Sequence, residues 1–177
     1  PSDVDIFNMG TINNLVAVAW IDTLDLNSPG WVTLHDTDGN FFDGVDNEIQ
    51  EVGPTPRSLA FSPDGTWLVV ACSGEGEYEM TDPKAEIVCI EVHSLATEPY
   101  DWGDVLGHSF DFDDGPHIVG GGPLMITGFE ARTSQYDGTP GLSHLLEPSH
   151  VSITPDSQRA FVNCQVNNTL VEVNLGN

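Results

Sequence analysis

Residues 56–72 read Pro-Arg-Ser-Leu-Ala-Phe-Ser-Pro-Asp-Gly-Thr-Trp-Leu-Val-Val-Ala-Cys, and residues 148–164 read Pro-Ser-His-Val-Ser-Ile-Thr-Pro-Asp-Ser-Gln-Arg-Ala-Phe-Val-Asn-Cys. The two stretches align without a gap at one offset of 92 residues (148 − 56 = 92), with proline, the Pro-Asp pair and cysteine at matching places. Self-similarity at a fixed spacing is typical of repeat architectures. The chain is therefore expected to contain a repeated structural unit.

Each copy has the pattern of a β-hairpin. Leu59 and Phe61 alternate with small or polar residues, a Ser-Pro-Asp-Gly segment follows, and residues 67–71 form an apolar run. Proline presets the backbone for the first central position of a turn, and aspartate and glycine suit the positions after it. A further strand is expected after each hairpin, at residues 86–92 and 169–175. Strands joined in this way predict an all-β fold built of β-propeller blades.

The spacing of the copies predicts how the blades divide the chain. Blades have roughly 40–50 residues, so an offset of 92 predicts an irregular blade between the two copies. We expect blades at about residues 1–53, 54–95, 96–146 and 147–177. A propeller closes with about 4–8 blades, so three to four blades predict part of a larger propeller. The remaining blades would belong to the same precursor or to another protein chain, and an open sandwich of the same strands is the alternative.

The chain is strongly acidic, with 4 Lys and Arg residues against 28 Asp and Glu residues and a formal net charge of −24. Nucleic acids and anionic membranes are poor partners for such a surface, because both bind through Lys and Arg. The charge favours calcium, other divalent cations or basic proteins. The alternative is that the charge only keeps the protein soluble.

The cysteines and the apolar runs indicate the environment of the protein. Cys72, Cys89 and Cys164 are too few for a disulfide-rich scaffold, so either all three are buried free thiols or Cys72 and Cys89 pair within one blade. The longest apolar stretch, residues 15–21, is far shorter than the ~20 residues of a membrane-spanning helix. A start at Pro1 fits removal of a leader, so we expect a secreted or cell-surface protein without membrane insertion.

Strands at residues 15–20 and 31–36 are expected to form the first blade. The segment Asp-Thr-Asp-Gly-Asn from Asp36 begins like a calcium-binding loop, because it brings oxygen ligands together around one position. It lacks the glutamate at the twelfth position, where Asn47 stands, and Asp-Gly directly after a strand is typical of a hairpin turn. We therefore expect a turn.

Several segments carry a family resemblance: Leu-Val-Ala-Val-Ala from residue 15, Gly-Trp-Val-Thr-Leu-His-Asp-Thr-Asp-Gly from residue 30, Phe-Ser-Pro-Asp-Gly from residue 61, Asp-Pro-Lys-Ala-Glu-Ile-Val-Cys-Ile-Glu-Val from residue 82 and Glu-Pro-Ser-His-Val-Ser-Ile-Thr-Pro-Asp-Ser from residue 147. They are similar to the choice-of-anchor I domain family, which includes mesenchyme-specific cell surface glycoproteins and bacterial proteins described as phytase-like or alkaline-phosphatase-like. The resemblance implies an extracellular, seven-bladed-like propeller, of which this chain covers the amino-terminal part.

Two sets of acidic residues are candidate ligands for calcium. The resemblance places Glu75 and Glu147 in loops beside the repeated strands, although the proline of the family's loop is missing after Glu75. The second set mixes imidazoles and carboxylates, which bind divalent metals: His108, Asp111, Asp113, Asp114 and His117. Each set has a simpler explanation, a solvated acidic loop for the first and a half-buried strand ending in a turn for the second.

The segment Asn-Asn-Thr at residues 167–169 has two readings. It is a glycosylation sequon, which predicts a glycan on Asn167 of a secreted protein. The Asn-Asn pair also suits a two-residue hairpin turn with positive φ.

Enzyme signatures are missing from the sequence, which has no Gly-x-Ser-x-Gly, His-Glu-x-x-His or dinucleotide-binding motif. We expect a non-catalytic module for structure, adhesion or assembly. The alternative, implied by the phytase-like relatives, is a calcium-dependent phosphoester hydrolase. Such an enzyme would need cationic side chains for phosphate, and Arg57 and Arg159 beside the repeated hairpins are the candidates.

Overall fold

The structure is a computed structural model that describes residues 1–7, 14–41, 49–74, 84–92, 107–111, 118–119, 122–123, 125–127, 146–167 and 169–176. These residues form antiparallel sheets, and the helix among them is a short 3-10 turn, Gln165–Asn167. The expected all-β fold is confirmed. No helix in these ranges is long and apolar enough to cross a membrane.

The first sheet is formed by β1 (Asp3–Phe7), β2 (Leu15–Trp20), β3 (Pro29–His35) and β4 (Ile49–Pro54), which pair in chain order. Burial along β2 alternates residue by residue, because successive side chains of a strand point to opposite faces. Leu15, Ala17 and Ala19 are buried, whereas Val16 and Val18 are partly exposed. One face of this sheet therefore packs inside the molecule.

The second sheet repeats this order with β5 (Pro56–Phe61), β6 (Trp67–Cys72), β7 (Glu86–Glu91) and β8 (Gly107–Asp111). The third sheet contains β12 (His150–Ile153), β13 (Arg159–Cys164) and β14 (Thr169–Asn174), and β11 (Met125–Thr127) pairs along the outside of β14. The short strands β9 (Ile118–Val119) and β10 (Gly122–Pro123) form a separate two-stranded pair.

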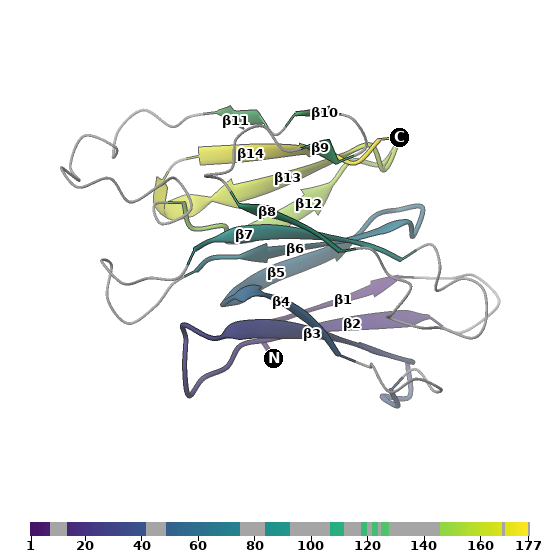
Figure 1. Cartoon of the computed structure of the whole chain (residues 1–177). Helices are drawn as coiled ribbons and strands as arrows, with labels where there is room; N and C mark the ends of the chain where they lie inside the picture. The colour runs from purple at the N-terminus through teal and green to yellow at the C-terminus, as the bar shows by residue number, and fades with distance from the viewer. Residues whose placement is uncertain are drawn as a thin grey trace.

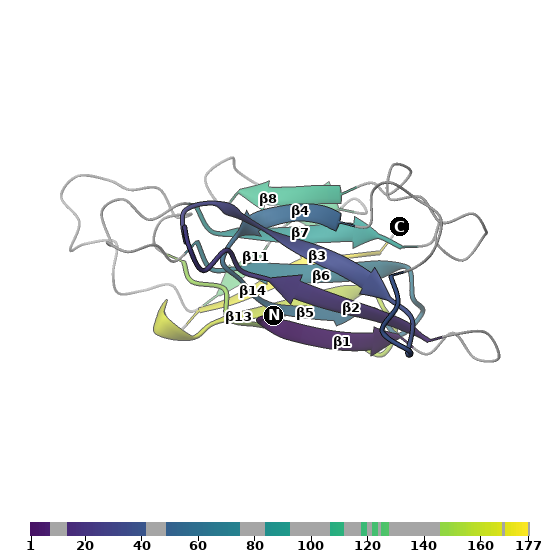
Figure 2. The ribbon, with the colours of Figure 1, turned by 90° about the horizontal axis from the view of Figure 1, so that it is seen from below.

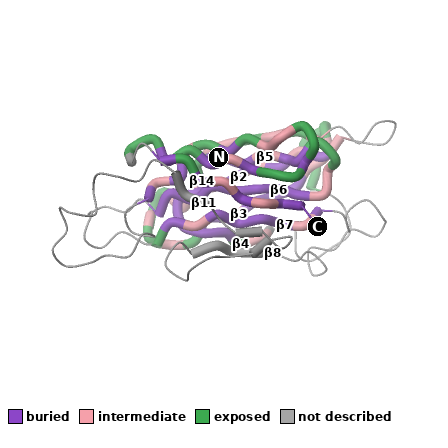
Figure 3. The backbone as a smooth tube through the Cα atoms, turned by 90° about the horizontal axis from the view of Figure 1, so that it is seen from above, coloured by how far each residue is buried: buried purple, intermediate pink, exposed green. Residues whose placement is uncertain are grey.

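The three larger sheets are stacked face to face, with the second sheet in the middle (Figure 1). Successive residues of β6 serve the two sides in turn: Leu68 and Val70 pack toward the first sheet, and Val69 and Ala71 toward the third. All six residues of β6 are buried, as the tube through β6 and β7 in Figure 3 also shows. A continuous apolar run is the pattern expected of a strand that is covered on both faces.

Most of the expected irregular blade at residues 96–146 lies outside the described residues, so this division of the chain stays a prediction. The second and third sheets share one core, in which Val69 and Ile87 pack with Val162 and Val171. Of the described strands between the two copies, β8 pairs with β7 and β11 with β14, whereas β9 and β10 pair with each other.

The first Pro-Asp turn is closed by its own polar groups. The N–H of Gly65 donates to the carbonyl of Ser62, and Asp64 Oδ1 accepts hydrogen bonds from the Ser62 hydroxyl at 2.6 Å and the Thr66 N–H at 3.0 Å. Gly65 has a φ of 75°, in the left-handed region that glycine tolerates. The expected hairpin is confirmed.

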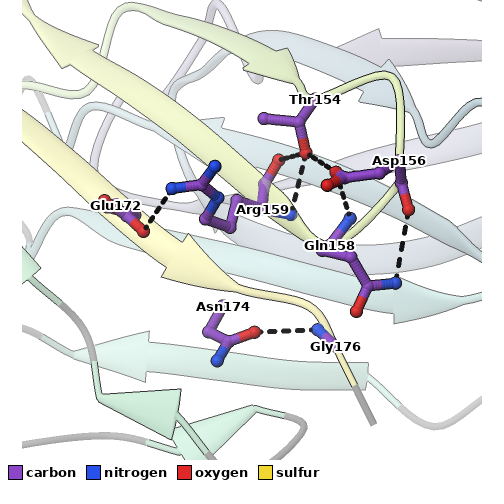
Figure 4. Close-up of polar contacts among 7 residues, drawn as sticks. All are labelled: Thr154, Asp156, Gln158, Arg159, Glu172, Asn174 and Gly176. Atoms are coloured by element: carbon purple, nitrogen blue, oxygen red, sulfur yellow. Dashed lines mark hydrogen bonds and ion pairs between the residues drawn. The ribbon is translucent and has the colours of Figure 1, made fainter.

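The second Pro-Asp turn has the same pattern 92 residues later (Figure 4). The N–H of Ser157 donates to the carbonyl of Thr154, and Asp156 accepts hydrogen bonds from the Thr154 hydroxyl and the Gln158 N–H. Ser157 occupies the position of the glycine with a φ of 58°. The repeat seen in the sequence is thus a repeat of individual hydrogen bonds.

The connection at the glycosylation sequon is longer than expected. Cys164 at the end of β13 pairs with Thr169 at the start of β14, so residues 165–168 form the loop, and a 3-10 turn occupies its first three residues. The expected two-residue turn is therefore wrong, because the strands stop pairing one residue earlier on each side.

The segment after β3 is a turn, as expected. The carboxylate of Asp36 accepts hydrogen bonds from the backbone N–H groups of Asp38 and Asn40, both at 2.9 Å, and Gly39 has a φ of 84°. The bond with the Asn40 side chain is the main reason that the pKa of Asp36 is lowered. The oxygens that a calcium loop would turn toward an ion are used here to close the turn.

Candidate functional site

One edge strand of each large sheet, β1, β5 and β12, lies beside another, with β5 in contact with both β1 and β12. Figure 2 shows β1 beside β5. At the first seam, Asp3 accepts a hydrogen bond from the N–H of Leu59 at 2.9 Å, and Asp5 accepts one from the N–H of Phe61 at 2.8 Å. Backbone N–H groups at a free strand edge need a partner. Two carboxylates of the first sheet satisfy this need for the second sheet.

The second seam uses an equivalent position. Ser58 lies opposite Ala71 in β6, as Asp3 lies opposite Ala19 in β2, and its hydroxyl accepts a hydrogen bond from the N–H of Val151 at 3.3 Å. The Ser58 hydroxyl is also 3.4 Å from Nδ1 of His150. Ser58 is only 2% exposed, so this serine and histidine join two sheets and do not present a nucleophile to a substrate.

A cleft of about 230 Å³ opens between β4 of the first sheet and β7 of the second. The cleft is lined by Glu51, Val52 and Gly53 of the first sheet and by Glu86 and Val88 of the second. Glu51 lies opposite Trp31, on the face that points away from the second sheet, whereas the carboxyl group of Glu86 would lie 3.2 Å from a Cβ at Gly53. The carboxylate beside this apolar surface is therefore that of Glu86, which suits an ammonium or guanidinium group.

Two glutamates, Glu86 in the cleft and Glu147 before β12, each have a buried thiol beside them. Burial, and after it the charge of Glu86, raises the pKa of the Cys72 thiol well above its usual range. Burial, and after it the charge of Glu147, raises the pKa of Cys164 to about 12. Burial also raises the pKa of Cys89. All three cysteines are free and buried, so the expectation of free thiols is confirmed, and Cys72 and Cys89 pack on opposite faces of the second sheet.

We expect the native protein to resist thiol reagents. At pH 8 a thiol with a pKa of about 12 is ionised in only about one molecule in 10⁴, and the thiolate is the reactive form. Ellman's reagent should label all three cysteines of the chain unfolded in guanidinium chloride. Over the same time it should label none of them in the folded chain. Rapid labelling of one cysteine in the native protein would contradict the packing of that strand.

The candidate calcium ligands are only partly within the described residues. Glu147 is half-buried just before β12, next to Cys164. The backbone of Asp111 ends β8, where it pairs with Glu86 of β7. Glu75, Asp113 and Asp114 lie outside the described residues, as do His117 and the side chain of Asn167. Among the side chains that the structure describes, no three His, Cys, Asp or Glu groups are close enough to hold a metal ion.

Sequence reasoning missed Glu86 because it stands in a strand, between Ala85 and Ile87, and not in an acidic run. The sequence feature that could have indicated this cleft is Gly53, because a glycine within a strand often marks a bulge or a close approach of another segment. Pairing between sheets, which brings β4 beside β7, is a tertiary contact that local patterns do not reveal.

The two arginines beside the hairpins have protein partners. Arg159 lies 3.6 Å from Glu172 and its guanidinium is 5.8 Å from the centre of the Phe161 ring (Figure 4 shows the ion pair). Nε of Arg57 donates to the Ser73 hydroxyl at 3.4 Å. Both arginines therefore contribute to the structure around the repeated strands.

These features define an all-β protein of stacked four-stranded sheets, joined at their inner strands by side chain to backbone hydrogen bonds and carrying an acidic cleft between the first two sheets. The family model described as choice-of-anchor I domain matches residues 1–177, so the chain belongs to that family. Searches among curated proteins and among solved structures find no significant match.

Proposed function

We propose that the chain is part of an extracellular β-propeller that acts as a non-catalytic module for structure, adhesion or assembly. Stacked four-stranded meanders with their first strands side by side are the arrangement of successive propeller blades. The carrying observation is that both seams are closed at equivalent inner-strand positions, by Asp3 and by Ser58. Further sheets of the same precursor or of another chain would continue this arrangement.

The polar groups near the inner strands support a structural role. Asp3, Asp5 and Ser58 are engaged with backbone N–H groups of the next sheet, and a catalytic group must be able to reach a substrate. The hydrolase alternative has weaker support. A phosphate site needs a cationic side chain that binds its ligand, and Arg159 is instead paired with Glu172.

The ligands proposed for this surface are calcium and basic proteins. A net charge of −24 attracts both, and the cleft with Glu86 offers a defined place for a cationic group. Glu147 stands just before β12 and Asp111 ends β8, whereas Glu75 lies outside the described residues. Choice-of-anchor domains typically occur on extracellular or cell-surface proteins, which supports a calcium-rich setting and a glycan on Asn167.

The proposal is tested by a phosphatase assay together with a calcium titration. The purified chain should release no phosphate from p-nitrophenyl phosphate or phytate, with or without Ca²⁺. Calcium should raise the melting temperature, and the variant Glu86→Gln should lose the rise, because a neutral amide binds Ca²⁺ far more weakly than a carboxylate.

The matched control is Glu91→Gln, which changes the same residue type at the other end of β7 and should keep the response to calcium. Turnover that requires Ca²⁺ and disappears in Glu86→Gln would overturn the non-catalytic assignment in favour of the hydrolase. A melting temperature that ignores calcium in every variant would remove calcium from the proposal.

A further inference from the structure

We propose that the cleft between β4 and β7 binds one cationic side chain, a lysine or an arginine, of a basic partner protein. This inference rests on the proposed assembly function and specifies which chemical group of the partner is bound, and where. The ligand is an aliphatic stem that ends in an ammonium or guanidinium group.

The cleft combines buried apolar surface with a carboxylate. Val52 of β4 and Val88 of β7 are only 4% and 5% exposed, and both line the space of about 230 Å³. Pro29 and Pro54, which lie opposite each other in β3 and β4, add two rigid apolar rings to the lining. The stem of a lysine or arginine packs its methylene groups on such surface while its charged end reaches a polar partner.

Gly53 brings the side chain of Glu86 directly against the backbone of β4. A Cβ at position 53 would lie 3.1 Å from Cβ and 3.2 Å from Cδ of Glu86, so a larger residue would displace the glutamate. Glu86 is half-buried, and hydrogen bonds between a cation and a carboxylate are stronger where water is partly excluded. The carboxylate is therefore already positioned beside the apolar surface.

The backbone beside the cleft is irregular in ways that are frequent at binding sites. The pairing of β3 with β4 shifts its register between Pro29 and Gly30, and bulges of this kind are common next to functional sites. Thr55, directly after Pro54, has a φ of 53°, which is unfavourable for a β-branched residue. The carbonyl of Thr55 accepts hydrogen bonds from the N–H and the hydroxyl of Ser73, which hold this conformation. The fold thus fixes this end of the cleft.

The charge of the chain selects a basic partner. A net charge of −24 attracts basic proteins from a distance and repels acidic ones. The chain has 4 Lys and Arg residues of its own, and one of them, Lys84, stands two residues before Glu86. The test must therefore separate binding of a partner's cation from occupation of the cleft by Lys84.

An NMR titration of the ¹⁵N-labelled chain tests the proposal, with N-acetyl-lysine N′-methylamide and the corresponding arginine derivative as probes. At least one probe should shift the amide resonances of Val52, Gly53 and Val88, with a dissociation constant of about 1–10 mM for a single side chain. The norleucine derivative, which has an aliphatic stem and no charge, should bind at least about tenfold more weakly. Tighter binding of the lysine probe supports an ammonium ligand, and tighter binding of the arginine probe supports a guanidinium ligand.

Three variants locate the bound cation. Glu86→Gln should weaken binding of the preferred probe at least about fivefold, because the charge-assisted hydrogen bond is lost. The matched control Glu91→Gln, at the other end of β7, should bind the probe like the native chain. Lys84→Met should bind it at least as tightly as the native chain, since the cleft residues are unchanged. Circular dichroism melting shows that each variant remains folded.

Four results would overturn the proposal: equal binding of the norleucine derivative, binding that Glu86→Gln leaves unchanged, binding that appears only in Lys84→Met, or no shift with either cationic probe at about 50 mM. The titration is done in EDTA and without phosphate esters, so it does not depend on calcium binding or phosphatase activity. Turnover of a phosphate ester would overturn the proposed function and leave the result of the titration unchanged.

Discussion

Replacing Leu68 by alanine is expected to lower the free energy of unfolding by about 3 kcal/mol. Leu68 is fully buried in the strand at the middle of the stack, where it packs against the first sheet. Removing its side chain loses the transfer free energy of three methyl or methylene groups and leaves a cavity that sheets on both sides hold open. Since small domains have a total stability of about 5–15 kcal/mol, this is a large fraction.

The control for Leu68→Ala is Val18→Ala, in the equivalent strand of the first sheet but on its partly exposed outer face. It should cost no more than about 1 kcal/mol, because little apolar area leaves the interior. Urea unfolding followed by circular dichroism gives both values from the same linear extrapolation. Equal losses in the two variants would contradict the assignment of the second sheet as the sheet that is covered on both faces.

Replacing Gly30 by alanine should have a comparable effect, about 3 kcal/mol, through crowding. A Cβ at this position would lie 2.4 Å from Cδ of Pro56 and 2.7 Å from the carbonyl oxygen of Trp20. A proline ring and a backbone carbonyl cannot rotate away, so the start of β3 would have to move from β5. Gly30 therefore sets how closely the first sheet approaches the second.

The control is Gly39→Ala, where no atom lies within 4 Å of the added Cβ and only the left-handed φ of 84° opposes a side chain. This variant should lose only about 1 kcal/mol. The same urea titration ranks the two glycines. A milder effect at Gly30 than at Gly39 would mean that the first two sheets have room to separate.

The strands themselves were predictable from local patterns. The expected strands at residues 15–20, 86–92 and 169–175 match β2, β7 and β14 to within one residue, because alternating or continuous apolar runs report directly on burial. The turn at Asp64 was predictable for a similar reason, since its hydrogen bonds lie within five residues.

The contacts between sheets were not predictable in the same way. Nothing local indicates that β8 and β11 join existing sheets, or that Asp3 reaches the N–H of Leu59, 56 residues away. The cleft depends on such a contact too, because it forms only where β4 lies beside β7. Acidic residues close together in sequence drew attention to Glu75 and to Asp111, Asp113 and Asp114, but not to Glu86, which packing places in the cleft.

The order of strands within each sheet also bears on how the protein is made. The first and second sheets each consist of four consecutive strands, so each has all of its partners as soon as its own stretch has left the ribosome. Domains with such short-range pairing fold quickly and expose few unpaired edges during synthesis. The third sheet differs, because β11 precedes β12 and β13 in the chain but pairs with β14, which follows them. Completion of this sheet therefore waits for β14, and nascent chains stalled before β14 should hold two finished sheets and one that remains open.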